Sequence, residues 1–139
     1  MATGVSKSLY LSNKLLDHVL RVASFTMPAA LYVALYTADP GEGSSAGVPG
    51  GTEVGTVNTN YARQTLTFGT SSGGSNANTN TVSFASVGSA GYGTVTYMAI
   101  MDAVTGGAML YHGPLTTPRT YVAGDAPSFA IGAITLLED

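Results

Sequence analysis

The chain has 139 residues, a mass of 14.1 kDa and a formal net charge of −3 at pH 7, and 9% of its residues are charged. Its length suits one domain, whereas an average soluble domain carries about 25% charged residues. Five Lys and Arg residues are too few for the cationic face that nucleic acids require, which excludes DNA and RNA as partners. The 45% apolar content excludes a disordered chain.

The sequence also argues against membrane insertion and disulfide bonding. The longest nearly apolar run, residues 27–36, has ten residues, against the roughly 20 that a membrane-spanning helix needs. Residues 1–14 lack the apolar stretch of a secretory signal, so we expect the protein to stay in the cytoplasm where it is made. There is no cysteine, so the fold must be stabilised by packing alone.

The N-terminal quarter of the chain predicts one helix. Apolar residues at helical spacing are Leu11, Leu15, Val19 and Val22, with Leu16 and Leu20 beside them. They predict an amphipathic helix over 12–23 that is capped by Ser12 or Asn13, carries an Asp17–Arg21 pair, and packs Leu16 and Leu20 in apolar contacts. Residues 1–10 show no fold of their own and are interpreted as an N-terminal arm whose deletion leaves the fold intact.

Past the helix, short β-rich runs between turn residues predict strands. Residues 31–36 are almost entirely apolar and are stopped by Asp39-Pro40-Gly41, as expected of a central strand buried on one or both faces. Further strands are expected at 61–68, 81–85, 94–101, 108–112, 119–122 and 128–137, with a hairpin turn at 102–107. Pro114 is expected to end the strand at 108–112.

Two Gly-, Ser- and Asn-rich segments, 41–60 and 69–80, are predicted to be long loops. Loops of this length in a small domain usually bind something or are held by a neighbour. The complete pattern predicts a single β domain over 1–139. Its fold class is all-β, a jelly-roll-like β-sandwich with one short N-terminal α-helix.

Candidate nucleophiles and bases are weak in this sequence. Residues 43–47 match G-x-S-x-G around Ser45, but the strand and helix that must flank a nucleophilic serine are missing, which favours a flexible loop. His18 lies beside Asp17 on the predicted helix, and His112 lies at a strand end near Pro114. Both are interpreted as structural histidines.

Candidate ligand sites are equally weak. Asp39, Glu42 and Glu53 share one loop, but they lack the D-x-D-x-D-G pattern of calcium sites. Residues 88–93 read G-x-x-G-x-G and lead into a strand, which indicates a turn and not a phosphate cradle. We therefore predict no catalytic, cofactor-binding or metal-binding residues, and no enzymatic activity.

The weakly charged surface indicates association. Eight tyrosines could line a carbohydrate groove or a protein interface, although packing in the core or on a sheet face is favoured for each of Tyr10, Tyr32, Tyr36, Tyr61, Tyr92, Tyr97, Tyr111 and Tyr121. Monomeric proteins usually keep their surfaces soluble with mixed charge, which this chain lacks. We expect it to bind other copies of itself, which would shield exposed strand edges.

An ordered set of motifs resembles one protein family over nearly the whole chain, from about residue 9 onward. The motifs are LSNKLLDHVL (11–20), ALYVALYTADP (30–40), GTEV (51–54), YARQ (61–64), GTVT (93–96), DAVTGG (102–107) and GPLTT (113–117). Together they resemble small structural proteins of tailed bacteriophages, described as tail-fibre proteins or capsid cement proteins. The departures lie in the loop after Pro40 and in 69–80, where partner contacts could differ.

The resemblance implies a non-enzymatic virion component that is assembled in the host cytoplasm. We favour a capsid cement or decoration protein, since a low-charge β module can bury area across capsomer seams in contact with the major capsid protein. The alternative is a tail or tail-fibre protein that contacts tail proteins and presents loops to a host receptor. A third class, a glycan-binding or hydrolytic β module, would show glycan affinity or a turnover that depends on His112.

Overall fold

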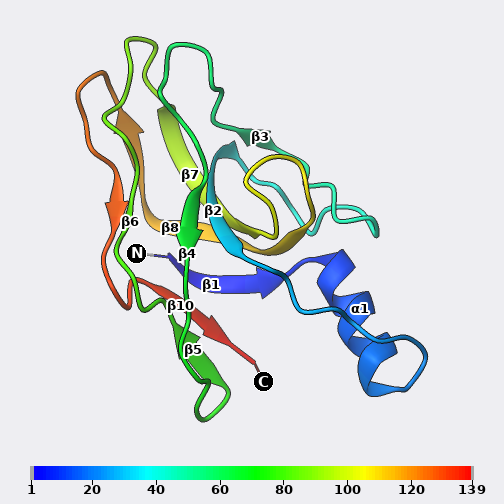
Figure 1. The fold of residues 1–139 in the computed structure, drawn as a ribbon. Coiled ribbons are helices and arrows are strands. Elements are labelled where there is room, and N and C mark those ends of the chain that lie inside the picture. Colours follow the sequence, from blue (N-terminus) through cyan, green and yellow to red (C-terminus); the bar gives the residue numbers. More distant parts are fainter. Residues whose placement is uncertain (1, 139) are drawn as a thin grey trace.

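Residues 2–138, the part of the chain that the computed structural model describes, form one helix and ten strands (Figure 1). In chain order the elements are β1 (Ala2–Lys7), α1 (Leu9–Val19), β2 (Leu31–Ala38), β3 (Thr52–Glu53), β4 (Gln64–Leu66), β5 (Ser75–Ala77), β6 (Val82–Ser83), β7 (Gly93–Met101), β8 (Met109–Tyr121), β9 (Ser128–Phe129) and β10 (Ile134–Leu137). The all-β fold with one short N-terminal helix, predicted from the sequence, is confirmed.

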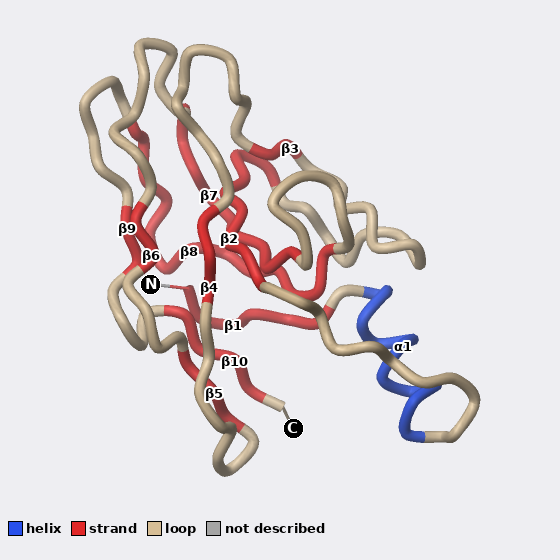
Figure 2. The backbone as a smooth tube through the Cα atoms, in the orientation of Figure 1, coloured by secondary structure: helices blue, strands red, loops and turns tan. Residues whose placement is uncertain are grey.

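Most of the strands join one curved sheet, and β6 and β9 form a small second sheet (Figure 2). The strand order is β3-β2-β7-β8-β1-β10-β5, with β4 also pairing with β2. A bridge between Phe68 and Asn78 joins the segment after β4 to the segment after β5, so opposite ends of the sheet meet around the core. The arrangement is sandwich-like, as the fold-class prediction requires.

The core lies on both faces of the central strands. In β2, Val33 and Leu35 enter the main cluster, whereas Ala34 and Tyr36 enter a second cluster on the opposite face. Alternating side chains of a strand point to opposite faces, so β2 is buried on both sides. The sequence prediction of a central, buried strand over 31–36 is thus confirmed.

The N-terminal arm predicted over 1–10 is wrong for the residues that the structure describes; Met1 lies outside them. Residues 2–7 form β1, which lies between β8 and β10, antiparallel to the first and parallel to the second. Val5 packs against the main core. The strand is held by pairing on both sides, and its own sequence carries no alternating pattern that could reveal it.

The helix also starts and ends earlier than the predicted 12–23. Its cap is Ser8, whose Oγ accepts a hydrogen bond from the Leu11 N–H at 3.1 Å and donates one to the Met109 carbonyl at 2.6 Å. After Leu20 the chain turns at Arg21, whose φ of 65° ends the helix. Arg21 therefore lies beyond the helix, where it cannot form the predicted helical pair with Asp17.

Several strand boundaries differ from prediction because local signals were overridden by pairing. Pro114 does not end a strand: β8 continues to Tyr121 and absorbs the strand expected at 119–122, with an irregularity opposite β7 between Val95 and Tyr97. The strand predicted over 61–68 shrinks to β4. The one predicted over 128–137 divides into β9 and β10 around a turn at 130–133.

The two predicted loops contain short strands and have their own hydrogen bonds. The 41–60 segment includes β3, and the 69–80 segment includes β5. In the first, the Gly50 N–H donates to the Pro40 carbonyl at 2.8 Å, and the Gly47 carbonyl accepts from the Met109 N–H at 2.9 Å. A Cβ at Gly47 would lie 2.5 Å from the Ala108 Cβ, so this loop packs directly onto β8.

Candidate interaction site

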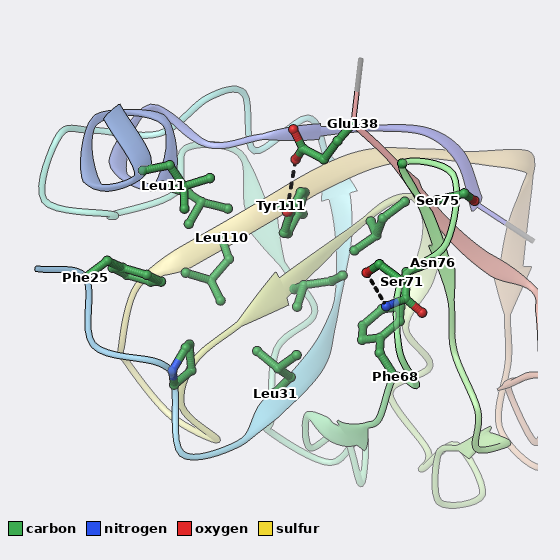
Figure 3. Close-up of a pocket in the computed structure, with 15 residues that line it drawn as sticks. Leu11, Phe25, Leu31, Phe68, Ser71, Ser75, Asn76, Leu110, Tyr111 and Glu138 are labelled. Carbon is green, nitrogen blue, oxygen red and sulfur yellow. Dashed lines mark hydrogen bonds between the residues drawn. The ribbon is translucent and has the colours of Figure 1, made fainter. Parts of the chain in front are cut away.

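An apolar pocket of about 460 Å³ lies between α1, the segment after it, the 68–76 segment, and residues of β2, β7, β8 and β10 (Figure 3). Its lining is mostly apolar: Leu11, Leu15, Phe25, Pro28, Leu31, Phe68, Ile100, Leu110, Tyr111 and Leu136, with Ser71, Gly74, Ser75, Asn76 and Glu138 at the polar positions. Figure 3 shows Leu11 and Phe25 on one side and Phe68 and Asn76 on the other. Such a volume and lining are typical of binding pockets.

The helix side of the pocket is formed by α1 and the segment after it, which a hydrogen bond to His18 connects. Leu11 is the buried residue of α1, whereas Leu15 is half-buried and lines the pocket. Beyond the helix, the Phe25 N–H donates a hydrogen bond to His18 Nδ1 at 3.1 Å. This bond returns the chain toward the helix and places Phe25 and Pro28 on the pocket wall.

The rim of the pocket is polar and internally satisfied. Glu138 accepts hydrogen bonds from Lys7 Nζ and from the Tyr111 hydroxyl, and Asn76 Nδ2 donates to Ser71 Oγ at 2.9 Å. Burial, with a contribution from the Glu138 charge, raises the pKa of Tyr111 to about 12. The Tyr111 hydroxyl therefore keeps its proton near neutral pH and acts as a hydrogen-bond donor to Glu138.

Most of the helix outside the pocket is uncovered. The predicted contacts of Leu16 and Leu20 are wrong, since these residues are 58% and 67% exposed, and Val19 is 73% exposed. Figure 1 shows the reason: α1 projects to one side of the sheet from the end of β1. Helical periodicity correctly groups these apolar residues on the helix, but it does not indicate whether other parts of the chain pack against them.

A second polar cluster surrounds Arg63. Its guanidinium binds both carboxylate oxygens of Glu53 at 2.8 Å and donates to the carbonyls of Ala103 and Gly106 at 2.9 and 2.7 Å. Glu53 also accepts from the Tyr61 hydroxyl, whose pKa is raised mainly by burial. The bond to Glu53 raises the pKa of Arg63. This cluster ties β3 and the segment before β4 to the 102–107 turn.

Ser45 and the two histidines lie on three different elements. Ser45 is exposed in the loop after β2, and its neighbour Ser44 accepts the backbone bonds that shape this turn. His18 is on α1 and is engaged by Phe25. His112 is on β8, where burial lowers its pKa against the opposing charges of Asp39 and Glu42, and its Nε2 is buried without a hydrogen-bond partner.

The acidic residues and the glycine-rich motif singled out in the sequence make contacts within the fold. Asp39 Oδ1 accepts the Gly41 N–H at 2.8 Å, and Glu53 is engaged by Arg63. Within residues 2–138, no group of three His, Asp or Glu side chains is placed to hold a metal ion. The glycine motif packs against backbone, since a Cβ at Gly88 would lie 2.4 Å from the Asn58 carbonyl oxygen, and β7 follows it directly.

Three of the eight tyrosines are buried, and the other five are half-buried. Tyr36, Tyr61 and Tyr92 each expose 6% or less of their surface. Tyr61 stacks with Phe84 and meets Tyr92 edge to face, with ring centroids 6.0 and 5.6 Å apart. Packing in the core or on a sheet face, which the sequence favoured, is confirmed for these three and for Tyr97, Tyr111 and Tyr121, which pack against the two core clusters.

Within the described part of the chain, α1 falls far short of the length and apolar character that crossing a membrane would take.

The fold and the pocket define a small β protein with one projecting apolar helix. Residues 6–137 match the model of a protein family described as "Podophage GP4 fiber I protein gp80". This match covers nearly the whole chain, and the chain belongs to this family. A search of curated proteins finds no match. The predicted resemblance to bacteriophage structural proteins is thereby confirmed, and the protein is a phage structural protein.

Proposed function

We propose that the protein is a non-enzymatic component of a bacteriophage tail fibre, which binds copies of itself and neighbouring tail proteins. The observation that carries this proposal is the family match over residues 6–137, because the family is one of phage fibre proteins. It favours the alternative that the sequence left open over the capsid cement role that we preferred. The sequence alone favoured cement because a low-charge β module can bury area across capsomer seams through many modest contacts.

The structure supports binding more than catalysis. The uncovered helix and the apolar pocket are features of an interaction surface. The candidate Ser45 sits in an exposed turn, and the imidazoles lie on α1 and β8. Tail proteins are the natural neighbours of a fibre component, and the virion is its final location.

Copy number in purified particles tests this proposal against the cement role. We would quantify the chain against the major capsid protein by mass spectrometry and locate it with antibody-labelled electron microscopy. A small multiple of three or six copies, labelled at the tail, is the expected result. Hundreds of copies over the capsid would refute the fibre role and restore the cement role.

A separate assay tests the absence of enzymatic activity. Purified protein would be incubated with bacterial cell-wall and surface polysaccharides, and release of reducing ends would be measured. We expect no turnover. A reproducible activity that disappears with His112→Ala, but persists with His18→Ala, would overturn the proposal and return the hydrolytic alternative.

A further inference from the structure

We propose that the apolar pocket beside α1 binds one molecule of an amphiphile, in which an alkyl chain carries an uncharged, hydroxylated head group such as a sugar. The inference goes beyond the proposed fibre role, which assigns no ligand to this pocket. It rests on the division of the lining, because apolar side chains form one part of the pocket and polar groups gather at another (Figure 3).

The apolar part of the pocket has a floor made by the central strands. Leu31 of β2, Ile100 of β7 and Leu110 of β8 line it, and Ile100 and Leu110 are fixed by burial, since they are 1% and 4% exposed. Leu11 and Leu15 of α1 close one side. These five side chains are aliphatic and carry no polar atom, so they favour contact with hydrocarbon. The volume of about 460 Å³ lies within the usual range of small-molecule sites, about 300 to 1,000 Å³.

The polar part of the pocket belongs to one strand pair. Ser71, Ser75 and Asn76 lie in β5 or in the turn before it, and Glu138 directly follows β10. The strands β5 and β10 are antiparallel neighbours, and the Glu138 N–H donates to the Gly74 carbonyl at 2.8 Å. The backbone therefore holds these polar groups next to one another, independently of α1.

The polar part of the pocket favours an uncharged head group. Lys7 Nζ donates to Glu138 Oε2, and the two side chains are 34% and 47% exposed. An anionic head group would be placed beside the Glu138 carboxylate, and a cationic one would compete with Lys7 for it. An uncharged head group leaves this ion pair intact.

The hydrogen-bonding groups that remain open suit hydroxyls. A carboxylate has about four acceptor positions, and Lys7 and Tyr111 each donate to one oxygen of Glu138. Ser71 Oγ accepts from Asn76 Nδ2 at 2.9 Å, so its own hydrogen can be donated to a ligand. A hydroxyl both donates and accepts, and a head group with several hydroxyls can therefore meet both kinds of partner.

The two parts of the pocket should contribute differently to affinity. Burial of each methylene group of the alkyl chain should tighten binding about fourfold. A few placed polar groups mainly fix the orientation of a ligand. Chain length should therefore set the affinity, and a sugar without a chain should not be held.

The test is isothermal titration calorimetry of the purified full chain with octyl β-D-glucoside below its critical micelle concentration. We expect saturable binding of one molecule per chain. Hexyl β-D-glucoside should bind roughly 15-fold more weakly, since two methylenes are lost at about fourfold each. Glucose should not bind measurably. Octyl β-D-glucuronide, which adds a carboxylate to the same sugar, should bind severalfold more weakly than the glucoside.

Matched serine variants test whether the ligand occupies this pocket. Ser75 is half-buried in the lining, and Ser75→Trp should abolish binding by filling the polar part. Ser71→Trp makes the same test from an exposed position of the lining, where a large side chain disturbs folding less. Ser45→Trp is the control, because Ser45 is exposed in the loop after β2, and it should bind like wild type. Circular dichroism checks that each variant is folded.

Backbone amide shifts of the isotope-labelled chain separate the pocket from the exposed side of α1. With octyl β-D-glucoside, the largest changes are expected at Leu31, Ile100 and Leu110. Changes confined to the exposed Leu16 and Leu20 would show adsorption of the alkyl chain to the helix surface and would overturn the inference.

Four calorimetric results would also overturn it: no saturable binding of octyl β-D-glucoside, equal affinity for the hexyl and octyl compounds, tighter binding of the glucuronide, or unchanged binding by both pocket variants. The fate of the proposed function is independent. A chain that binds the glucoside but is absent from tail fibres would refute the fibre role and leave the ligand site standing, and a fibre protein that binds no amphiphile would do the reverse.

Discussion

Replacing Arg63 with alanine tests whether the polar cluster around it holds the loop end of the fold together. Arg63 makes four hydrogen bonds, two to the Glu53 carboxylate and two to carbonyls of the 102–107 turn, and its side chain is 7% exposed. Charge-assisted hydrogen bonds contribute about 1.5 to 3 kcal/mol each in mutational data, but they are not additive. Glu53 is 26% exposed and regains water once Arg63 is gone.

We therefore expect Arg63→Ala to lower the free energy of unfolding by about 2 to 4 kcal/mol. For a domain of this size, that is a fall in melting temperature on the order of 6 to 12 °C. Arg63→Lys keeps the charge, but one ammonium cannot span a carboxylate and two carbonyls, so we expect at least half of the loss. Urea unfolding followed by circular dichroism measures both changes.

The matched control is Arg119→Ala. Arg119 is exposed on β8, and its guanidinium lies 5.7 Å from the Tyr121 ring centroid. An exposed substitution of this kind should stay within about 0.5 kcal/mol of wild type. If Arg63→Ala lowered the free energy of unfolding no more than Arg119→Ala does, the cluster would not stabilise the fold. The reasoning from burial and hydrogen bonds would then be wrong.

Three more changes probe the backbone and the buried phenols. Gly51→Ala should cost several kcal/mol, because φ is +64° and the new Cβ would lie 2.4 Å from the Ala38 carbonyl oxygen; Gly55→Ala meets open space, and similar melting temperatures for the two would contradict this. Deleting residues 2–7 should unfold the protein, since β1 joins β8 to β10; a native circular dichroism spectrum would restore the arm. Burial raises the pKa values of Tyr36 and Tyr111 to about 12 from 10, so the unfolded chain ionises first and stability should fall as the pH rises from 10 to 12. Between pH 10 and 12, the urea midpoint of the double variant Tyr36→Phe, Tyr111→Phe should fall less than that of wild type. An equal fall in both proteins would show that these two phenols do not cause the loss of stability.

The central strands could be predicted because their signal is local. Residues 31–36 and 94–101 are runs of apolar and β-branched side chains, a pattern typical of strands that are buried on both faces. The structure places β2 and β7 there. The helix was found for a similar reason. Its start was misplaced because the cap is Ser8, whose Oγ accepts the Leu11 N–H and is itself held by a bond to the carbonyl of Met109, 101 positions away.

The remaining errors share a non-local cause. The partners of β1 are β8 and β10, more than 100 residues along the chain, and nothing within residues 2–7 signals them. Pro114 is a strand breaker by local rules, yet it is exposed and lies next to an irregular stretch of the β7–β8 ladder. The pocket was missed because its walls come from six separate segments, none of which contains a binding motif.

Where a partner binds is better indicated by unmatched apolar area than by loop length. The long loop after β2 is a natural candidate by composition, but Gly47 and Gly50 are hydrogen-bonded and Gly47 packs onto Ala108. Its conformation needs no neighbour. The helix has the opposite character: its own backbone is satisfied by Ser8 and by the turn at Arg21, while Leu16 and Leu20 remain in water. A preformed helix with exposed leucines loses little further entropy on binding, so most of the apolar area that it buries contributes to affinity. On these grounds α1 is a better candidate for partner contact than the long loop after β2.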